Sequence, residues 1–283
     1  MPKNDGKIAF QGFAGAYSDM ACRAVYPGRE TLPCRTFEDA FQAVQKGHAG
    51  LAMIPVDNTL AGRVADVHHL LPRSGLYIIG EHFHPVRHAL LSVRGAKKTD
   101  LKHVHSHIHA IPQCRKMIAR LKLQAHVHAD TAGAAAEVAQ RGDKAHAAIA
   151  SELAAQIYGL NIIEKNVQDE DHNTTRFLIL SRQHKIPAYN KNKSYLTSLI
   201  FRTRNIPAAL YKALGGFATN GVSMAKLESY VDPTFQVARF YAEVEDHAKS
   251  PALIRALEEL EFFAEEMHVM GTFTAHPFRQ EKK

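Results

Sequence analysis

Two threonines and an arginine stand at the start of an apolar, strand-forming run, in the segment H-N-T-T-R-F-L-I-L over residues 172–180. A strand of this composition is expected to be buried, so hydroxyl and guanidinium groups at its mouth need hydrogen-bonding partners. A bound ligand can supply those partners. Thr174, Thr175 and Arg176 are therefore candidates for binding or catalysis, although a strand-end arginine is often only solvated.

A glycine-containing turn occurs near the start of the chain, in F-Q-G-F-A-G-A-Y-S-D over residues 10–19. Gly12 and Gly15 let the chain turn tightly, and Ser18 or Asp19 is expected to cap the helix that follows. Backbone N–H groups at such a helix start can face an anion. A plain strand-to-helix turn has the same composition, so both interpretations stay open.

A second turn, M-I-P-V-D-N-T-L-A-G-R-V over residues 53–64, has the same mixture of polar side chains and glycine after an apolar strand. Asn58, Thr59 and Gly62 precede a helix that is predicted to start near Arg63. The short amide and hydroxyl side chains can either cap that helix or bind a carboxylate.

Histidine alternates with other residues in L-K-H-V-H-S-H-I-H, and more follow downstream. These residues are His103, His105, His107, His109, His126 and His128. On one strand the first four would share a face like a metal cluster, but no Asp, Glu or Cys stands at a familiar ligand spacing. If Ser106 begins a turn into a helix over residues 110–121, two of them leave that face. We predict no metal and no cofactor.

The composition describes a globular chain. Its 283 residues, 46% of them hydrophobic, suffice for about two domains, and the net charge of +7 suits an anionic ligand. The absence of a long basic run argues against nucleic acid, and the absence of a long apolar run argues against a membrane. Three widely spaced cysteines and the lack of a signal peptide predict a cytoplasmic protein.

Short strand patterns alternate with helical patterns in the first two thirds of the chain, which predicts an α/β domain with largely parallel sheets. The expected strands cover residues 7–11, 49–55, 76–80, 85–93, 146–150 and 175–180. Polar residues and a proline over 181–194 have the composition of a linker.

The remaining residues predict the order βαββαβ, a ferredoxin-like plan. The first strand is expected over 195–203, a helix over about 206–219, and two strands over 222–230 and 235–245 with a turn at 231–234. Asn205 with Pro207 and Ser250 with Pro251 are the expected helix starts. Leu253, Leu257 and Leu260 form an apolar stripe, which indicates core packing.

Five motifs, in this order, resemble those of the prephenate dehydratase family. F-Q-G-F-A-G-A-Y-S is similar to the family's opening glycine motif, P-V-D-N-T-L-A-G-R-V to its P-I-E-N-S segment, S-H-I-H-A-I-P-Q-C to S-H-P-Q-A-L-x-Q-C, D-T-A-G-A-A to S-T-A-x-A-A, and T-R-F is the signature itself. The resemblance covers nearly the whole chain. It implies conversion of prephenate to phenylpyruvate in L-phenylalanine biosynthesis.

The resemblance also implies a domain organisation. A catalytic domain over residues 5–183 would have two lobes like those of type II periplasmic binding proteins, with lobe 1 at about 5–82 and 163–183 and lobe 2 at about 83–162. A linker over 184–194 would lead to a ferredoxin-like ACT regulatory domain over 195–276. L-phenylalanine is then the expected effector, and a homodimer or homotetramer the expected assembly.

Roles for individual residues follow from the same resemblance. Thr175 would be the acid or hydrogen-bond donor to the leaving hydroxyl, with Arg176 and Phe177 beside it. The expected substrate-binding residues are Ala14, Tyr17, Ser18, Asn58, Thr59, Gly62, Ser106, His107 and Thr174. The expected phenylalanine-binding residues are Asn205, Pro207, Ala208, Ala209, Leu210, Glu228 and Ser229.

The chain departs from the family pattern in both parts. Asp57 stands for a glutamate and His109 for a glutamine, which puts a titratable group in place of a neutral amide. Ala208 stands for a glycine in the expected effector site, and Tyr230 with Val231 for an Arg-Pro pair. Two alternatives remain: an arogenate dehydratase, which a carboxylate near the substrate's side chain would favour, and a non-catalytic amino-acid sensor.

Overall fold

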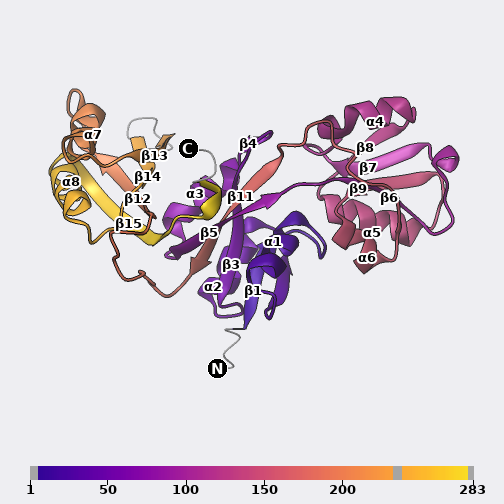
Figure 1. Cartoon of the computed structure of the whole chain (residues 1–283), viewed down its shortest axis with the longest axis horizontal. Coiled ribbons are helices and arrows are strands. Elements are labelled where there is room, and N and C mark those ends of the chain that lie inside the picture. The colour runs from indigo at the N-terminus through magenta and orange to yellow at the C-terminus, as the bar shows by residue number, and fades with distance from the viewer. Residues whose placement is uncertain (1–5, 232–237, 280–283) are drawn as a thin grey trace. The chain divides into compact units, whose positions relative to one another are not determined.

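The computed structural model describes residues 6–231 and 238–279, and these form two compact units (Figure 1). One unit comprises the chain up to Val67 together with His82–Phe177. The other comprises His68–Glu81 together with the chain from Leu178 onward. None of the described helices is long and apolar enough to cross a membrane.

The first sheet has the strand order β2-β1-β3-β11-β5, with β4 beside β3. Its strands are β1 (Lys7–Gln11), β2 (Glu30–Cys34), β3 (Leu51–Asn58), β4 (Gly62–Arg63), β5 (Tyr77–Pro85) and β11 (Thr174–Ser181). Strand β1 pairs in parallel with β2 and β3, as predicted for this part of the chain. Helices α1 (Tyr17–Val25) and α2 (Phe37–Gln45) follow the first two strands, and Thr36 begins α2 with a capping box.

The second sheet has the order β10-β6-β9-β7-β8. Its strands are β6 (Ala89–Ser92), β7 (His103–His107), β8 (Gln124–His128), β9 (His146–Ala150) and β10 (Asn161–Glu164). Helix α4 (Arg115–Arg120), which follows the short turn η3 (Ile111–Cys114), lies on one face, while α5 (Thr131–Arg141) and α6 (Glu152–Tyr158) lie on the other (Figure 1). Leu90, Val104, Met117 and Ile149 belong to the core under α4.

A close contact joins the loop after β1 to helix α6 of the second sheet's layer. Ser151 Oγ donates to the Gly15 carbonyl at 2.5 Å, and Tyr158 Oη donates to the Ala14 carbonyl at 2.9 Å. Gly15 has φ of +87°, and an added Cβ would lie 2.8 Å from the Ala154 Cα atom. Glycine is therefore required here both for its backbone conformation and for the close approach.

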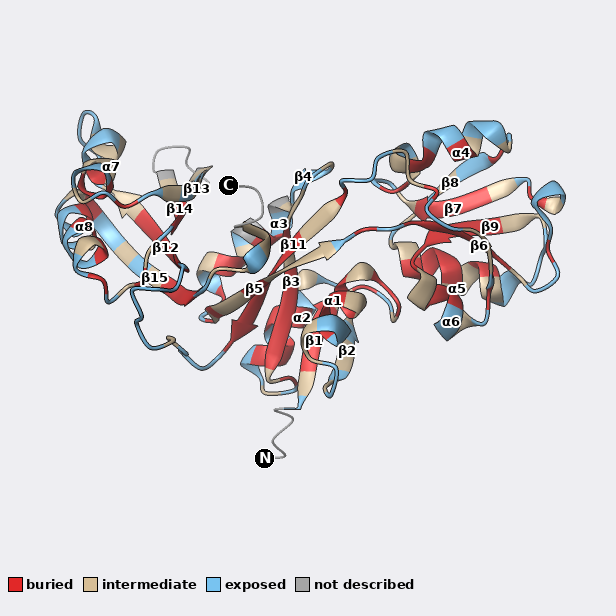
Figure 2. Cartoon of the chain, in the orientation of Figure 1, coloured by how far each residue is buried: buried red, intermediate tan, exposed pale blue. Residues whose placement is uncertain are grey.

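The second unit contains the six elements in the predicted βαββαβ order. They are β12 (Tyr195–Thr203), α7 (Ala209–Thr219), β13 (Met224–Val231), β14 (Ala238–Val244), α8 (Pro251–Phe263) and β15 (Ala264–Thr274). The strands form an antiparallel sheet in the order β13-β14-β12-β15. Both helices pack on one face, where Phe217, Leu253 and Leu260 meet Phe201 and Phe240 in a buried core (Figure 2).

The remaining short elements are α3 (Ala65–Leu70), η1 (Leu71–Arg73), η2 (Lys98–Asp100) and η4 (Pro277–Arg279). Residues 182–194 contain no helix or strand, as their composition indicates. Of the turn predicted at 231–234, Val231 is the last residue of β13, and the other residues fall outside the described ranges, as does the predicted strand start at 235.

The predicted helix starts are right in one case and wrong in two. Ser250 caps α8 by accepting from the Leu253 N–H, and Leu257 packs beside the buried stripe. Asn205 does not cap α7, which begins at Ala209 after Ala208 in a left-handed conformation with φ of +57°. Helix α1 begins at Tyr17, ahead of the predicted caps Ser18 and Asp19.

Candidate active site

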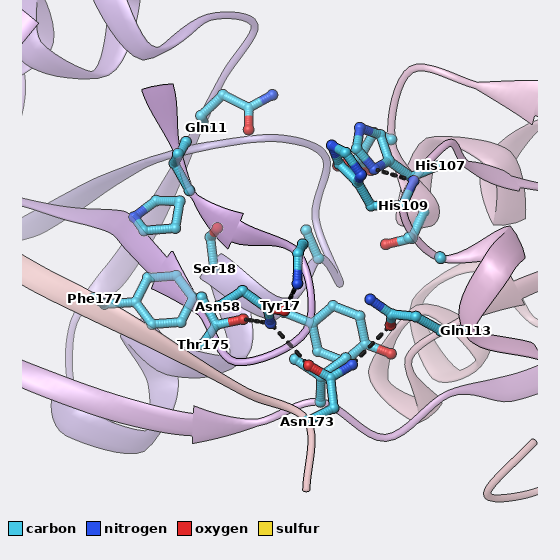
Figure 3. Close-up of a pocket in the computed structure, with 18 of the residues that line it drawn as sticks. Gln11, Tyr17, Ser18, Asn58, His107, His109, Gln113, Asn173, Thr175 and Phe177 are labelled. Atoms are coloured by element: carbon cyan, nitrogen blue, oxygen red, sulfur yellow. Dashed lines mark hydrogen bonds between the residues drawn. The ribbon is translucent and has the colours of Figure 1, made fainter. Parts of the chain in front are cut away.

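A cavity of about 590 Å³ lies in the first unit, and both of that unit's sheet layers contribute to its wall (Figure 3). This volume lies within the range typical of small-ligand sites. The polar residues of the lining are Gln11, Tyr17, Ser18, Asn58, Arg63, Asp66, His88, His107, His109, Gln113, Asp130, Thr131, Asn173 and Thr175.

The T-R-F segment enters the cavity through alternate residues of β11. Thr175 and Phe177 line the cavity, and Arg176 lies between them on the opposite side of the strand, since successive strand side chains point to opposite faces. The Arg176 side chain is buried, with Nη1 at 3.5 Å from the Asp57 carboxylate. The predicted direct contact of Arg176 with a ligand is therefore not what the structure shows.

Asn58 ends β3 and directs the Thr175 hydroxyl. Its Oδ1 accepts the backbone N–H groups of Leu60 and Ala61 at 2.9 and 2.8 Å, which fixes which end of the amide is Nδ2. Asn58 Nδ2 then donates to Thr175 Oγ1 at 2.9 Å. Because Thr175 Oγ1 accepts this bond, its own hydrogen can be donated to a ligand in the cavity.

The same logic fixes the polarity of a longer chain of side chains. Asn58 Nδ2 also donates to Asn173 Oδ1 at 2.8 Å, so Asn173 Nδ2 is the donor to Gln113 Oε1 at 2.7 Å. Gln113 Oε1 is 3.0 Å from His88 Nε2, which must therefore carry the proton. Two backbone amides thus determine the orientation of three amide side chains and one imidazole tautomer.

His88 closes this network at its far end. Burial lowers the pKa of His88 to about 4, so the imidazole is neutral at pH 7, with Nδ1 as an acceptor. Tyr17 Oη lies 2.8 Å both from His88 Nδ1 and from the Arg87 carbonyl oxygen, two acceptors for one hydroxyl hydrogen. Burial also raises the pKa of Tyr17, which keeps that hydrogen in place.

The start of α1 offers amide groups to an anion. Its first residue follows Ala16, whose methyl side chain cannot cap the helix, and Tyr17 and Ser18 both line the cavity. Asp19, the other predicted cap, instead accepts from the Gly15 N–H at 2.8 Å. Uncapped amides at a helix start, together with the helix dipole, favour a carboxylate.

Four of the predicted binding residues lie outside the cavity lining: Ala14, Thr59, Ser106 and Thr174. Ser106 is fully buried and donates to the Ile149 carbonyl, and Thr59 donates to the His172 carbonyl while accepting from the Thr174 N–H. These bonds position the strand ends. Asn58 and Gly62 do line the cavity, and Gly62 pairs with Asn58 in a hairpin. The helix predicted to start near Arg63 begins at Ala65.

Strand β7 runs to His107, so Ser106 does not begin a turn as one alternative predicted. His107 and His109 both line the cavity. Burial and the neighbouring His109 lower the pKa of His107, which keeps its imidazole neutral.

Three members of the network were missed among the predicted site residues: His88, Gln113 and Asn173. Gln113 stands in the S-H-I-H-A-I-P-Q-C motif, and Asn173 directly precedes the two threonines, so both had a signal in the sequence. His88 lies in a segment that was predicted only as a strand, and nothing in its sequence context marks it.

Four other histidines form a closed ring of contacts on the second sheet. His103 and His105 of β7 each contact His126 of β8 and His146 of β9, with ring centroids 4.6–5.2 Å apart. Bonds of 3.1 Å (His103 to His126) and 2.8 Å (His105 to His146) link them in pairs. Across residues 6–231 and 238–279, no three His, Cys, Asp or Glu side chains are arranged to hold a metal ion.

A cavity of this size in an α/β unit, with converging amide and hydroxyl groups and an uncapped helix start, is the site of a protein that binds a small organic anion. The sequence profile of the prephenate dehydratase family matches residues 8–185. The chain belongs to the prephenate dehydratase family, and is therefore a dehydratase of the carbon–oxygen lyase class.

Individual relatives agree with this assignment. The chain is 49% identical over 275 residues to a bifunctional N-acyl-homoserine lactone acylase/prephenate dehydratase of Komagataeibacter europaeus, covering 96% of this chain and 97% of that protein. It is 38% identical to arogenate dehydratase/prephenate dehydratase 2 of Arabidopsis thaliana, covering 94% and 72%. The crystal structure of Arthrobacter aurescens prephenate dehydratase in complex with L-Phe matches with a TM-score of 0.86 and 25% identity over 95% of this chain and 90% of that one.

Proposed function

We propose that the protein converts prephenate to phenylpyruvate, carbon dioxide and water, as a step of L-phenylalanine biosynthesis. The observation that carries the proposal is the Thr175 hydroxyl, held by Asn58 so that its hydrogen is available inside the cavity. Aromatisation of the ring supplies the driving force, so the protein mainly has to bind an anion and stabilise the departing hydroxyl.

Thr175 acts on the bond that breaks. The ring carboxylate leaves as carbon dioxide, and the electron pair of the broken carbon–carbon bond moves into the ring. The carbon–oxygen bond to the hydroxyl on the opposite side of the ring then breaks, and its electron pair stays on oxygen. Threonine is too weak an acid to ionise at neutral pH, but a fixed hydroxyl donor stabilises the negative charge that develops on this oxygen. The leaving oxygen takes up one proton overall and departs as water.

Other cavity groups would orient the substrate. The amides at the start of α1, with Tyr17 and Ser18, are placed to hold a carboxylate, and Arg63 adds a guanidinium to the lining. Phe177 offers a ring edge or face to the cyclohexadiene. Arg176 would act through Asp57, by fixing the strand that carries Thr175, and we expect it to be a positioning residue.

The test is to incubate the purified protein with prephenate and to quantify phenylpyruvate. We expect turnover by the wild type, and a kcat lower by about 10² or more for Thr175→Ala, from the usual size of a general-acid term. Thr174→Ala is the matched control, since Thr174 lies on the same strand but not in the lining. No turnover of prephenate by the wild type, whether or not it converts arogenate, would overturn the proposal.

Acylase activity is a second candidate, because the 49% identical relative carries that name beside the dehydratase one. If this chain shares it, the neutral imidazole of His107 in the cavity is the group best placed to activate water on an amide. Release of homoserine lactone from an N-acyl-homoserine lactone, inhibited by prephenate, would support it. Absence of release would exclude it.

We also propose that residues 5–183 form the catalytic domain and 195–276 an ACT domain that binds L-phenylalanine, in a homodimer or homotetramer. The βαββαβ order supports this, as does the L-Phe named in the structure of the relative. Residues 205 and 207–210, with Glu228 and Ser229, are the proposed effector site. Titrating phenylalanine into the activity assay tests it, and insensitivity up to millimolar concentrations would contradict it.

A further inference from the structure

The hydrogen-bond network of the cavity is one hydrogen short at its far end. Its polarity is fixed from the Asn58 amide, along the amide side chains in Figure 3, to the proton on His88 Nε2. Nδ1 of His88 is then an acceptor, and it lies 2.8 Å from Tyr17 Oη. That hydroxyl also lies 2.8 Å from the Arg87 carbonyl oxygen. One hydroxyl hydrogen cannot serve both acceptors, so one of the two short contacts brings lone pairs together.

A second proton on His88 removes this conflict. With Nδ1 protonated, His88 donates to Tyr17 Oη, and Tyr17 donates to the Arg87 carbonyl, so each short contact has its own hydrogen. The Nε2–H group continues to donate to Gln113 Oε1 at 3.0 Å. The surroundings of the ring therefore fit an imidazolium ion, because each of its two nitrogens faces an acceptor.

The free protein offers no counter-charge to such an ion. Within residues 6–231 and 238–279, the ring's hydrogen-bond partners are Tyr17 and Gln113, and both are neutral. His88 is 2% exposed, and burial lowers its pKa to about 4. The ring is therefore neutral in the free protein, and the conflict at Tyr17 persists there.

The nearest titratable and charged groups do not change this balance. The Cys114 thiol adjoins Tyr17, and burial raises its pKa to about 12, so it is neutral. Asp169 faces that thiol, and its carboxylate accepts the Lys116 backbone N–H at 3.1 Å. Arg87 pairs with Asp171 at 3.4 Å, and both side chains are exposed. None of these described side chains hydrogen-bonds to the His88 ring.

A dianionic substrate supplies the charge that the protein lacks. His88 lines the cavity, and the other charged residues of the described lining, histidines apart, are Arg63, Asp66 and Asp130. One basic and two acidic side chains leave no excess of positive charge to meet two carboxylates. Negative charge in the cavity favours the charged form of a buried imidazole beside it.

We propose that His88 takes up a proton from solvent when the dianionic substrate binds, and that the imidazolium so formed is the counter-charge that holds the substrate. This inference rests on the proposed dehydratase function. The proton forms one N–H bond at Nδ1, and no other bond changes in this step. The overall reaction also takes up one proton, because prephenate carries two negative charges and phenylpyruvate carries one.

The first test counts the protons that are taken up on binding. The probe is prephenate with both ring double bonds reduced, which keeps both carboxylates and the hydroxyl but cannot become aromatic. Calorimetric titration at about pH 7.5, where an ordinary histidine is mostly neutral, is repeated in buffers of different ionisation enthalpy. We expect uptake of about one proton per site by the wild type and about none by His88→Gln. Tyr17→Phe, which removes the acceptor of the Nδ1 hydrogen, should also lower the number.

His109→Gln is the matched control. It also removes an imidazole of the lining, but His109 is exposed, so water can solvate its charge with or without a ligand. Proton uptake is expected to stay at the wild-type value in this variant. Uptake that persists in His88→Gln, or that disappears in His109→Gln, would assign the proton to another group and refute the inference.

A second readout uses prephenate itself and is independent of how tightly the probe binds. If the productive complex holds one more proton than the free protein, kcat/KM of the wild type falls about tenfold per pH unit between about pH 6.5 and 8. This slope should persist in His109→Gln and be lost in His88→Gln, and the wild-type slope needs no substituted protein to fold. A flat wild-type profile would refute the inference and leave the proposed function standing. Absence of prephenate turnover by the wild type would remove both.

Discussion

Replacing Asn58 by aspartate reverses one hydrogen bond at the candidate reaction centre while changing a single heavy atom. In the wild type, Asn58 Nδ2 donates both to Thr175 Oγ1 at 2.9 Å and to Asn173 Oδ1 at 2.8 Å. In Asn58→Asp an acceptor oxygen stands there, since the other oxygen still accepts from the Leu60 and Ala61 amides. The Thr175 hydroxyl must then turn its hydrogen toward residue 58, away from the substrate.

The size of the effect follows from the loss of this one donor. Removing one preorganised donor to a developing oxyanion typically costs about 10²–10³ in kcat, or about 2.7–4 kcal/mol. The added negative charge should also raise KM for an anionic substrate. The loss of the hydrogen-bond donor is therefore measured by the fall in kcat, not by the change in KM. The fold should persist, because Asn173, Gln113 and the His88 tautomer can reverse together and satisfy every bond in the opposite direction.

The assay is steady-state turnover by the wild type, Asn58→Asp, Thr175→Val and the double variant. We expect the double variant to be no slower than Thr175→Val, since both changes remove the same donor, and residues that act as a unit are not additive. Lowering the pH should restore part of the kcat of Asn58→Asp as its carboxyl regains a proton. A kcat of Asn58→Asp within about threefold of wild type, or additive losses in the double variant, would refute the reasoning.

Three further predictions concern stability. Gly15→Ala should destabilise the protein by about 2 kcal/mol or more in chemical denaturation, because Gly15 has a positive φ and an added Cβ would clash with the Ala154 backbone. Gly28→Ala is the control and should be nearly neutral, because there is open space around Gly28. Ala208→Gly should stabilise the protein by about 1 kcal/mol, because glycine adopts the left-handed conformation of residue 208 without the strain that alanine has there. Ala209→Gly, in the first turn of α7, is the control and should not stabilise the protein. Burial and the neighbours His126 and His146 lower the pKa of His105 in the folded protein to about 4. Between about pH 6.5 and 4 the unfolded chain therefore binds more protons than the folded chain. The free energy of unfolding should accordingly fall as the pH is lowered through this window. Melting temperatures of wild type and His105→Gln across this window should converge on acidification, and a constant gap would contradict this last prediction.

Sequence patterns located most of the elements because local periodicity and composition carry that information. Strands β1, β9 and β12 have the predicted bounds, and Ser250 caps α8 as its position before a proline indicates. The predicted starts of α1 and α7 were wrong because the backbone conformation, not a polar capping residue, determines where these helices begin. Gly15 has a positive φ just before α1, and Ala208 is left-handed just before α7.

The candidate site was predictable only in part, for a related reason. Thr175 and Asn58 were chosen because polar groups stand at strand ends, and both line the cavity. Arg176 was chosen for the same reason, but side chains alternate along a strand, so Arg176 points away from the face that carries Thr175 and Phe177. Ser106 fits the family pattern but donates to a buried carbonyl. The network through His88, Gln113 and Asn173 joins segments that are distant in the sequence. The structural preferences of single residues do not predict such long-range contacts.

The most direct test of the central claim is the rate at which Thr175→Val, which keeps the shape of threonine but lacks its hydroxyl, converts saturating prephenate. We expect native-like folding by circular dichroism and a kcat reduced by at least about 10². If this variant turns over prephenate at the wild-type rate, the departing oxygen is not stabilised by Thr175, and the mechanism proposed for this cavity is wrong.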